Sequence, residues 1–259
     1  MNLFDSHSHY NDEKFDTDRE LIIKETLSNG VSNFIVAGYN IESSKKAIEI
    51  AKEYEGIFAI VGISPNDLKD MDTDDIDNNI SEIEKLADND KVVAIGEIGF
   101  DYYWNKENKE LQKQVFIKQI ELANKKNLPI VIHTRDATID TINILKENNV
   151  IKKGIFHCCP LNMELIKEAI KLEFYISLSG VITFKNVKNA EEIINMIPED
   201  KLLIETDSPY LSPEPMRGKR NSSINVKYVA EKIANVKNKT LEEIADITSD
   251  NAKRIFNIK

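Results

Sequence analysis

The sequence has few cysteines, few histidines and no long apolar run. The two cysteines among its 259 residues, Cys158 and Cys159, are adjacent, and vicinal cysteines rarely form a structural disulfide. This usage suits a reducing compartment, so we expect a cytoplasmic protein. No apolar run approaches the ~18 residues that a membrane span needs. No cationic start precedes an apolar segment near the first residue, so we expect no signal peptide.

The chain also lacks an excess of positive charge. Its formal net charge is −10, which argues against a broad basic surface for nucleic acid. A substrate phosphate held by metal ions and a few local cations stays compatible with this balance. A Gly-x-Gly-x-x-Gly sequence after the first apolar run is also missing, which argues against a dinucleotide-binding fold.

What the chain does have is a series of short apolar runs separated by charged segments with helical spacing, such as 41–54, 107–126 and 163–172. The runs are continuous rather than alternating, as in parallel strands buried on both faces. We therefore predict an α/β fold, a (β/α)8 TIM barrel formed by residues 1–259 as one domain, with an open doubly wound sheet as the alternative. The predicted strands are 3–5, 33–37, 57–62, 92–97, 129–133, 154–157, 173–178 and 201–205.

The C-terminal tail predicts two further helices that close the barrel. Thr240 and Glu243 have the spacing of a capping box at the start of one helix. Residues 250–258 are expected to form the second. Earlier in the chain, residues 67–90 are rich in Asp and Asn and are expected to be a solvated loop and helix surface.

All four histidines stand at or just after the ends of predicted strands. His7 and His9 form a His-x-His pair after the first strand, and alternation along a strand turns both the same way. His133 ends the fifth strand and His157 the sixth. Because TIM barrels place their sites at the C-terminal ends of the strands, we expect these imidazoles to meet at one rim.

Carboxylates share this predicted rim. Glu97 ends the fourth strand, Glu205 ends the eighth, and Asp207 follows the eighth. A ligand set of nitrogen and oxygen fits zinc, manganese, magnesium or cobalt. The predicted ligands are the four histidines with Glu97 and Asp207. These six ligands exceed the needs of one tetrahedral ion, so we predict two divalent metal ions bridged by Glu97.

The six ligands are expected to divide between the two ions according to the strands that they follow. We expect His7, His9 and Asp207 on one ion, and His133 and His157 on the other. Asp207 would orient a metal-bound water and take its proton, which makes Asp207 and Glu97 the predicted catalytic residues.

With these residues in place, the sequence resembles the TatD family of metal-dependent hydrolases, within the amidohydrolase superfamily. The matching motifs are His-x-His, GEIGFDYY, HTRDA, FHC and ETDSPYLSPEPMRGKRN, and they extend over nearly the whole chain. The resemblance implies a (β/α)8 barrel, metal-ligand roles for the six residues named above, and hydrolysis of DNA phosphodiester bonds, often as an exonuclease.

Two stretches depart from the family pattern. Where the family has Gly-x-His-Pro-His after the third strand, this chain has Gly-Ile-Ser-Pro-Asn, with Ser64 and Asn66 in place of the histidines. Both can hydrogen-bond to a substrate, but neither titrates near neutral pH, so the source of a leaving-group proton stays open. The family pattern His-Cys-Phe-Ser-Gly is His-Cys-Cys-Pro-Leu here, which predicts a different pocket wall and leaves the role of Cys158 and Cys159 open.

Cations near the rim are candidate phosphate contacts. Arg135 follows His133 by two residues and should face the same side, where a guanidinium can hold a phosphate with two hydrogen bonds. The alternative is an ion pair with Asp101 or Asp136. Arg217 and Arg220 belong to a basic loop that is either a phosphate clamp or a solvated surface.

Aromatic residues also follow the fourth strand. Tyr102, Tyr103 and Trp104 can stack on a base or pack the loop, and Tyr102 is the predicted substrate contact.

The predicted function is metal-dependent hydrolysis of DNA phosphodiester bonds, as an exonuclease on single strands, by attack of a metal-bound hydroxide. A metal-dependent ester or amide hydrolase, such as a D-aminoacyl-tRNA deacylase, is the alternative. A metal-binding barrel without catalysis is a third reading. We expect DNA to bind locally at the metal site, no membrane or obligate protein partner, and a monomer.

Overall fold

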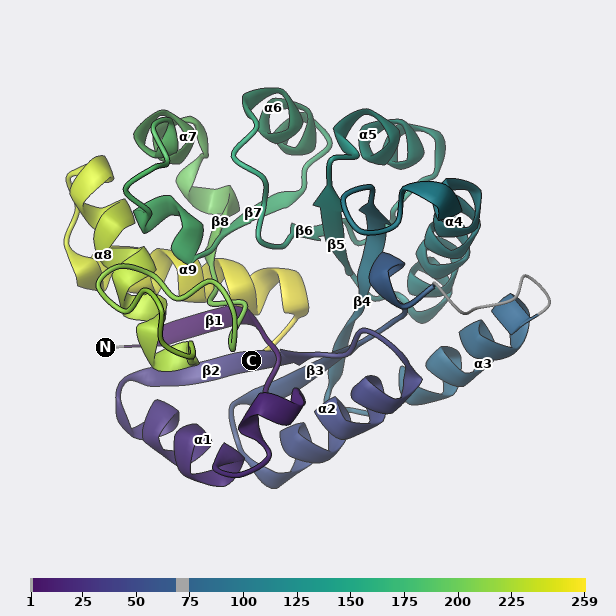
Figure 1. The fold of residues 1–259 in the computed structure, drawn as a ribbon, viewed down its shortest axis with the longest axis horizontal. Helices are drawn as coiled ribbons and strands as arrows, with labels where there is room; N and C mark the ends of the chain where they lie inside the picture. The colour runs from purple at the N-terminus through teal and green to yellow at the C-terminus, as the bar shows by residue number, and fades with distance from the viewer. Residues whose placement is uncertain (1, 69–74) are drawn as a thin grey trace.

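Eight parallel strands form the centre of the molecule (Figure 1). The computed structural model describes residues 2–68 and 75–259; part of the predicted solvated segment, residues 69–74, lies outside them. Each strand pairs with the next in chain order, which confirms the predicted barrel and excludes the open sheet. The strands are β1 Leu3–Ser8, β2 Val31–Ala37, β3 Ile57–Val61, β4 Val92–Asp101, β5 Ile130–Arg135, β6 Gly154–Phe156, β7 Tyr175–Leu178 and β8 Leu202–Ile204.

The barrel closes where the first strand meets the segment after the last one. Ser8 and Ser208 form an isolated parallel bridge. Beside it, His9 N donates to Ser208 O across 2.7 Å, and Asp207 N donates to His7 O across 3.0 Å. This contact between β1 and the end of β8, which we call the seam, brings two histidines next to Asp207.

Helices surround the barrel, as Figure 1 shows. The predicted helices at 41–54, 107–126 and 163–172 are confirmed to within two residues at each end. The helices are α1 Arg19–Ser28, α2 Ile41–Glu53, α3 Ile76–Leu86, α4 Lys109–Lys126, α5 Thr138–Glu147, α6 Met163–Lys171, α7 Ala190–Met196, α8 Val226–Lys237 and α9 Leu241–Phe256.

The tail contains two helices, but their bounds differ from the prediction. The capping box is confirmed, because Glu243 N donates to Thr240 Oγ1 across 3.1 Å and Thr240 N donates to Glu243 Oε2 across 2.8 Å. The separate helix predicted at 250–258 is wrong, since α9 continues without a break to Phe256. No Gly or Pro interrupts it, and it ends at Asn257 with φ of 54°, a common helix terminus. The other tail helix is α8.

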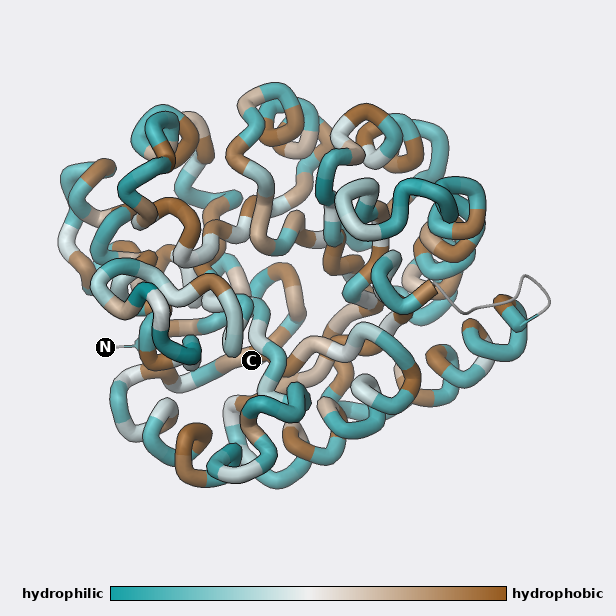
Figure 2. Tube along the Cα trace, viewed as in Figure 1, coloured by the Kyte–Doolittle hydropathy of each residue, from teal (hydrophilic) through white to brown (hydrophobic). Residues whose placement is uncertain are grey.

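Apolar side chains fill the barrel, and α9 covers its N-terminal end. Phe4 and its inward neighbours form one buried cluster with Ala252 and Phe256 of α9, and the Phe4 and Phe256 rings stack with centroids 6.5 Å apart. Figure 2 shows hydrophobic residues gathered along the strands and the helix faces turned toward them. With this end filled, polar side chains collect at the opposite end.

Candidate metal centre

Three side chains on the two sides of the seam form the first group of possible ligands. His7 Nε2 and His9 Nε2 lie 3.2 Å apart, and His9 Nε2 lies 3.2 Å from Asp207 Oδ1. The third distance, from His7 Nε2 to Asp207 Oδ1, is 3.9 Å. Two ligands about 2.0–2.1 Å from a tetrahedral ion lie about 3.3 Å apart, so this first group has the spacing of a metal site.

The backbone at Asp207 is fixed in an uncommon conformation. Asp207 has a φ of 54°, in the left-handed region that costs a non-glycine residue roughly 1 kcal/mol or more. Its N–H donates to His7 O, as described for the seam, and its own O accepts from Tyr210 N across 2.9 Å. These bonds hold the carboxylate toward the two histidines.

A second group lies beside the first. Glu97 Oε1 is 2.8 Å from His133 Nδ1 and 3.2 Å from His157 Nε2, and these two nitrogens are 3.2 Å apart. The other carboxylate oxygen, Glu97 Oε2, faces the first group at 3.8 Å from His7 Nε2 and 3.9 Å from His9 Nε2. Glu97 therefore stands between both groups, and His7 also lies within reach of Glu97 and His157.

A β-bulge turns Glu97 toward the barrel mouth. Gly96 pairs with Val131 and Ile98 pairs with Ile132, so Glu97 is an extra residue on β4 without a partner on β5. A bulge of this kind re-aims a side chain, often beside a site. Gly96 allows the close approach of the strands, because a Cβ there would lie 2.6 Å from Val131 Cβ.

The outer nitrogen of three of the four imidazoles faces an acceptor. His9 Nδ1 lies 3.2 Å from Ala37 O, and His133 Nε2 lies 2.9 Å from Asp101 Oδ2. His157 Nδ1 faces Glu205 Oε1 at 3.5 Å. With the proton on this outer nitrogen, the inner nitrogen keeps a lone pair aimed at its neighbours. Converging lone pairs repel unless a cation lies among them, so the donor set fits bound metal.

Burial and mutual interaction set the protonation of this cluster. Burial, together with His157 and His9, lowers the pKa of His7 well below its usual value. Burial raises the pKa of Glu97, but His157 and His133 outweigh that effect and hold the pKa well below its usual value. At neutral pH a neutral His7 and an ionised Glu97 result, which are the forms that bind a cation. Burial lowers the pKa of His157, but Glu97 and Glu205 outweigh burial and raise this pKa well above its usual value, so a cation that binds there displaces a proton from this ring.

The two groups open into a cavity of about 1030 Å³ at the barrel mouth. Both groups except the fully buried His7 reach its surface, and polar side chains from several loops surround them. Apolar walls come from aromatic and aliphatic side chains of the loops. The lining residues beyond the two groups include Asp12, Tyr39, Ser64, Asn66, Asp67, Trp104, Asn105, Arg135, Cys158, Cys159, Leu161, Val181 and Tyr210.

Comparison with known proteins places the chain in a family. The family described as "TatD related DNase" matches residues 4–257. The chain belongs to the TatD family. "Uncharacterized metal-dependent hydrolase YabD" of Bacillus subtilis (strain 168) is 48% identical over 257 residues, covering 99% of both chains. "Uncharacterized metal-dependent hydrolase YcfH" of Escherichia coli (strain K12) is 35% identical, covering 100% of this chain and 97% of the relative.

Solved structures show the same fold. The crystal structure of YJJV, a TatD homolog from Escherichia coli K12, superposes with a TM-score of 0.92 at 24% identity, covering 99% of this chain and 98% of that one. A TatD-family hydrolase from Entamoeba histolytica gives a TM-score of 0.87 at 22% identity, covering 99% and 98%. The chain is thus a TatD-type metal-dependent hydrolase. No helix within residues 2–68 and 75–259 is long and apolar enough to span a membrane.

Ser64 and Asn66, the two residues where the resemblance leads us to expect histidines, lie at the cavity. Ser64 and Asn66 both line it, on the segment that follows β3. Ser64 is buried, and its Oγ accepts from Asn66 N across 3.4 Å, as an N-cap of the short 3₁₀ turn Pro65–Asp67. Ser64 thus supports the local backbone, while the Asn66 side chain is exposed.

Arg135 lines the cavity, and the alternative ion pair with Asp101 or Asp136 does not form. Asp101, one of the two candidates, accepts from His133 instead. The Arg135 guanidinium lies over the Tyr103 ring, with Cζ 3.8 Å from the centroid. Within the described part of the chain it forms no ion pair, so its N–H groups are free for a substrate.

The side chains of three predicted substrate contacts, Tyr102, Arg217 and Arg220, do not line this cavity. Tyr102 is 7% exposed, and its hydroxyl donates to Asp140 Oδ2 across 2.7 Å. Arg217 lies over the Phe184 ring and donates to a backbone carbonyl.

Arg220 forms a two-point ion pair with Asp18, which lies 202 positions earlier. The basic loop is therefore held against the protein itself.

The adjacent cysteines are free thiols on the cavity wall. Cys158 N donates to Glu205 Oε1 across 2.6 Å, and Cys158 Sγ lies 3.2 Å from Ser179 Oγ. The first of these bonds orients Glu205 behind His157. The backbone of Cys158 therefore contributes to the site.

Asp101 and Asp5 are two buried carboxylates that the sequence analysis did not assign to the metal centre. Asp101 stands four residues after Glu97 on β4, an even spacing that a longer predicted strand would have placed on the same face. Asp5 accepts hydrogen bonds from Thr206 N and Thr206 Oγ1, which ties β1 to the end of β8. Asp5 precedes His7 by two residues, so the same strand alternation could have indicated it.

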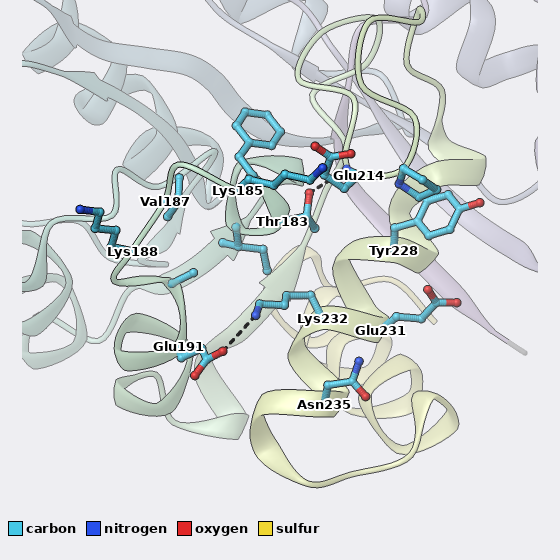
Figure 3. A pocket seen from close by; sticks show the side chains of 14 residues that line it. Thr183, Lys185, Val187, Lys188, Glu191, Glu214, Tyr228, Glu231, Lys232 and Asn235 are labelled. Atoms are coloured by element: carbon cyan, nitrogen blue, oxygen red, sulfur yellow. Dashed lines mark hydrogen bonds and ion pairs between the residues drawn. The ribbon is translucent and has the colours of Figure 1, made fainter.

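A second hollow lies away from the metal-site candidates. It measures about 630 Å³ between the turn Gly180–Thr183, α7 and α8. Figure 3 shows side chains of both charges around it, including Lys232 paired with Glu191 at 3.3 Å. Among the described residues, no group of possible metal ligands lies there.

Proposed function

We propose that residues 1–259 act as one barrel domain that hydrolyses phosphodiester bonds of DNA with two divalent metal ions, removing nucleotides from the end of a single strand. The observation that carries this proposal is the position of Glu97. One of its oxygens faces His133 and His157, and the other faces His7 and His9. A carboxylate with this placement suits a pair of ions about 3.5–4 Å apart.

The ions, when bound, would supply a nucleophile from water at neutral pH and neutralise charge on the reacting phosphate. Asp207 accepts the proton of the attacking water at its carboxylate, which already lies at the edge of the first group. Arg135 orients the phosphate through two guanidinium hydrogen bonds. Asp101 and Glu205 hold the rings of His133 and His157 in place.

The charged residues that line the cavity favour contact with only one or a few nucleotides of a DNA strand. Among the described residues that line the cavity, Arg135 is the single Arg or Lys, whereas Asp12 and Asp67 add negative charge. A polyanion that lay along the surface would need several cations. A strand end that places one phosphate at the centre needs only the metal ions and Arg135, which favours exonuclease action.

A nuclease assay tests the proposal. The purified protein is incubated with manganese or magnesium and end-labelled single-stranded DNA, in parallel with His133→Ala and the control Lys232→Ala, whose side chain lines the distant hollow in Figure 3. We expect nucleotide release by the wild type and the control and none by His133→Ala. No cleavage by the wild type, or equal cleavage by His133→Ala, contradicts the proposal.

A carbonyl substrate is the second candidate. Ser64 and Asn66 stand where the resemblance led us to expect histidines, and neither supplies a proton to a phosphate ester near neutral pH. The same centre would then hydrolyse an ester or amide, such as the ester of a D-aminoacyl-tRNA. A screen of esters, lactones and D-aminoacyl-tRNA beside DNA separates the two, and turnover of DNA alone eliminates the carbonyl candidate.

A further inference from the structure

Trp104 is an exposed aromatic side chain at the edge of the cavity. It is 66% exposed, and the neighbouring Tyr103 is 51% exposed, although large aromatic side chains are usually buried. Trp104 also lines the cavity that contains both candidate metal groups. A ligand can stack on such an exposed ring without displacing any side chain from the core.

The backbone below this ring is fixed by the same residue that orients a candidate metal ligand. Asp101 Oδ1 accepts from Tyr103 N and from Trp104 N, each across 2.9 Å, while Asp101 Oδ2 faces His133 Nε2. Gln112, which is fully buried, donates to Asn105 O across 2.8 Å. The loop is therefore held at a set position relative to the second group.

The loop continues into a contact with the segment that follows the neighbouring strand β3. Asn105 Nδ2 donates to Pro65 O across 3.0 Å, which joins the loop to the segment that contains Ser64 and Asn66. Trp104 thus projects from backbone supported on both sides. A supported aromatic ring loses little conformational entropy when a flat ligand stacks on it.

Arg135 lies beside the two rings. Its Cζ is 3.8 Å from the Tyr103 centroid and 5.7 Å from the Trp104 centroid, and the two rings meet edge to face at 4.8 Å. Stacking on Tyr103 holds the guanidinium without neutralising it. An aromatic face and a free cation therefore adjoin one another next to the candidate metal centre.

We propose that Trp104 and Arg135 form a subsite for the nucleobase attached to the reacting phosphate, with Trp104 stacking on the base and Arg135 contacting the phosphate. The subsite takes a flat aromatic base linked to a phosphate and accepts all four bases, because each presents a π face. It selects base-bearing phosphodiesters over those without a base. This assignment rests on the proposed phosphodiesterase function, but it is tested separately by binding.

Trp104 is the only tryptophan in the chain, so its fluorescence reports directly on stacking. Metal-loaded protein is titrated with deoxyadenosine 5′-monophosphate and with deoxyribose 5-phosphate, which lacks the base. We expect saturable quenching with the nucleotide and none with the sugar phosphate. An emission that the nucleotide leaves unchanged overturns the proposal.

Calorimetry of variants then isolates the ring. We expect Trp104→Leu to weaken nucleotide binding by about 5- to 100-fold and to leave sugar-phosphate binding unchanged, while Trp104→Phe retains most of the affinity. The control Tyr228→Leu removes an aromatic side chain from the distant hollow of Figure 3 and should change neither. Equal weakening of both ligands by Trp104→Leu, or an unchanged nucleotide affinity, contradicts the subsite.

Activity distinguishes this failure from failure of the proposed function. The ratio of kcat/KM for a dinucleotide to that for its analogue without the terminal base should fall in Trp104→Leu. A ratio equal to that of the wild type, with DNA still cleaved, removes the subsite and leaves the phosphodiesterase. Base-dependent quenching without any DNA cleavage removes the phosphodiesterase and leaves the subsite.

Discussion

His133 Nε2 lies 2.9 Å from Asp101 Oδ2, on the side of the imidazole opposite to Glu97. With the proton on Nε2, the ring donates to Asp101 and turns the lone pair of Nδ1 toward the centre. Glu205 stands in a similar position behind His157. A carboxylate behind a ligating imidazole raises its basicity and fixes its tautomer. This relationship leads to the first prediction.

Asp101→Asn should weaken binding of the second ion by about 10- to 100-fold, because an amide orients His133 less strongly than a carboxylate does. Isothermal titration with zinc or manganese measures the change. Asp140→Asn is the matched control, since Asp140 accepts a hydrogen bond from Tyr102 and does not line the cavity. An affinity in Asp101→Asn equal to that of the control would remove the orienting role.

Glu97→Gln should reduce the metal content from two ions per chain to about one or none. The carboxylate faces both groups, and a neutral amide cannot balance two divalent charges at this spacing. Activity should fall by more than the ~10- to 100-fold expected for a carboxylate behind a ligand. Elemental analysis of dialysed protein gives the stoichiometry. Two tightly held ions in the variant would show that Glu97 does not bridge.

Removal of metal should lower the melting temperature. Binding to the folded state alone stabilises it by about 2.7 kcal/mol at a metal concentration 100 times Kd. For a chain of this size that corresponds to roughly 5–10 °C. Calorimetric scans with and without EDTA measure the shift. The same comparison in Glu97→Gln serves as the control and should show a smaller shift, since this variant holds one ion or none. An EDTA shift equal to that of the wild type would argue against metal at this centre.

Arg220→Ala should reduce stability near pH 7 without changing the KM for DNA. The bonds from Arg220 lower the pKa of Asp18, so the ion pair contributes at pH values above the usual Asp pKa of about 4. This contribution, at most about 1 kcal/mol for a partly exposed pair, is lost as the pH falls through the lowered pKa of the folded state. Urea unfolding at pH 7 and pH 2.5 measures it.

The matching variant is Asp18→Asn. It should remove the same pH-dependent increment, since it breaks the pair from the other side. A raised KM in Arg220→Ala but not in Asp18→Asn would return Arg220 to the list of substrate contacts.

The sequence predicted the barrel because buried parallel strands appear as continuous apolar runs, and it predicted the convergence of ligands because the histidines stand at strand ends. Gly96 inside the predicted strand is a signal for a bulge, but the sequence does not show which residue is the extra one, since that depends on pairing between strands. The extension of β4 to Asp101 was also missed. Trp104 lines the cavity, whereas the predicted contact Tyr102 does not.

Contacts between residues far apart in the sequence explain why Arg220 lies away from the cavity. Nothing near Arg220 in the sequence indicates that Asp18 neutralises it. The error in α9 arose because Asp250 looks like the start of a helix, whereas the preceding residues already form one. A local pattern predicts where an element exists more reliably than where it begins or which distant residue it contacts.

The seam has a consequence for biosynthesis. His7 and His9 leave the ribosome about two hundred residues before Asp207 does. The first group of side chains cannot assemble until most of the barrel has been synthesised and its two edges have joined. Binding of an ion to the first group would thus show that the barrel of the newly made chain has closed. A chain truncated before Asp207 would lack this half of the centre.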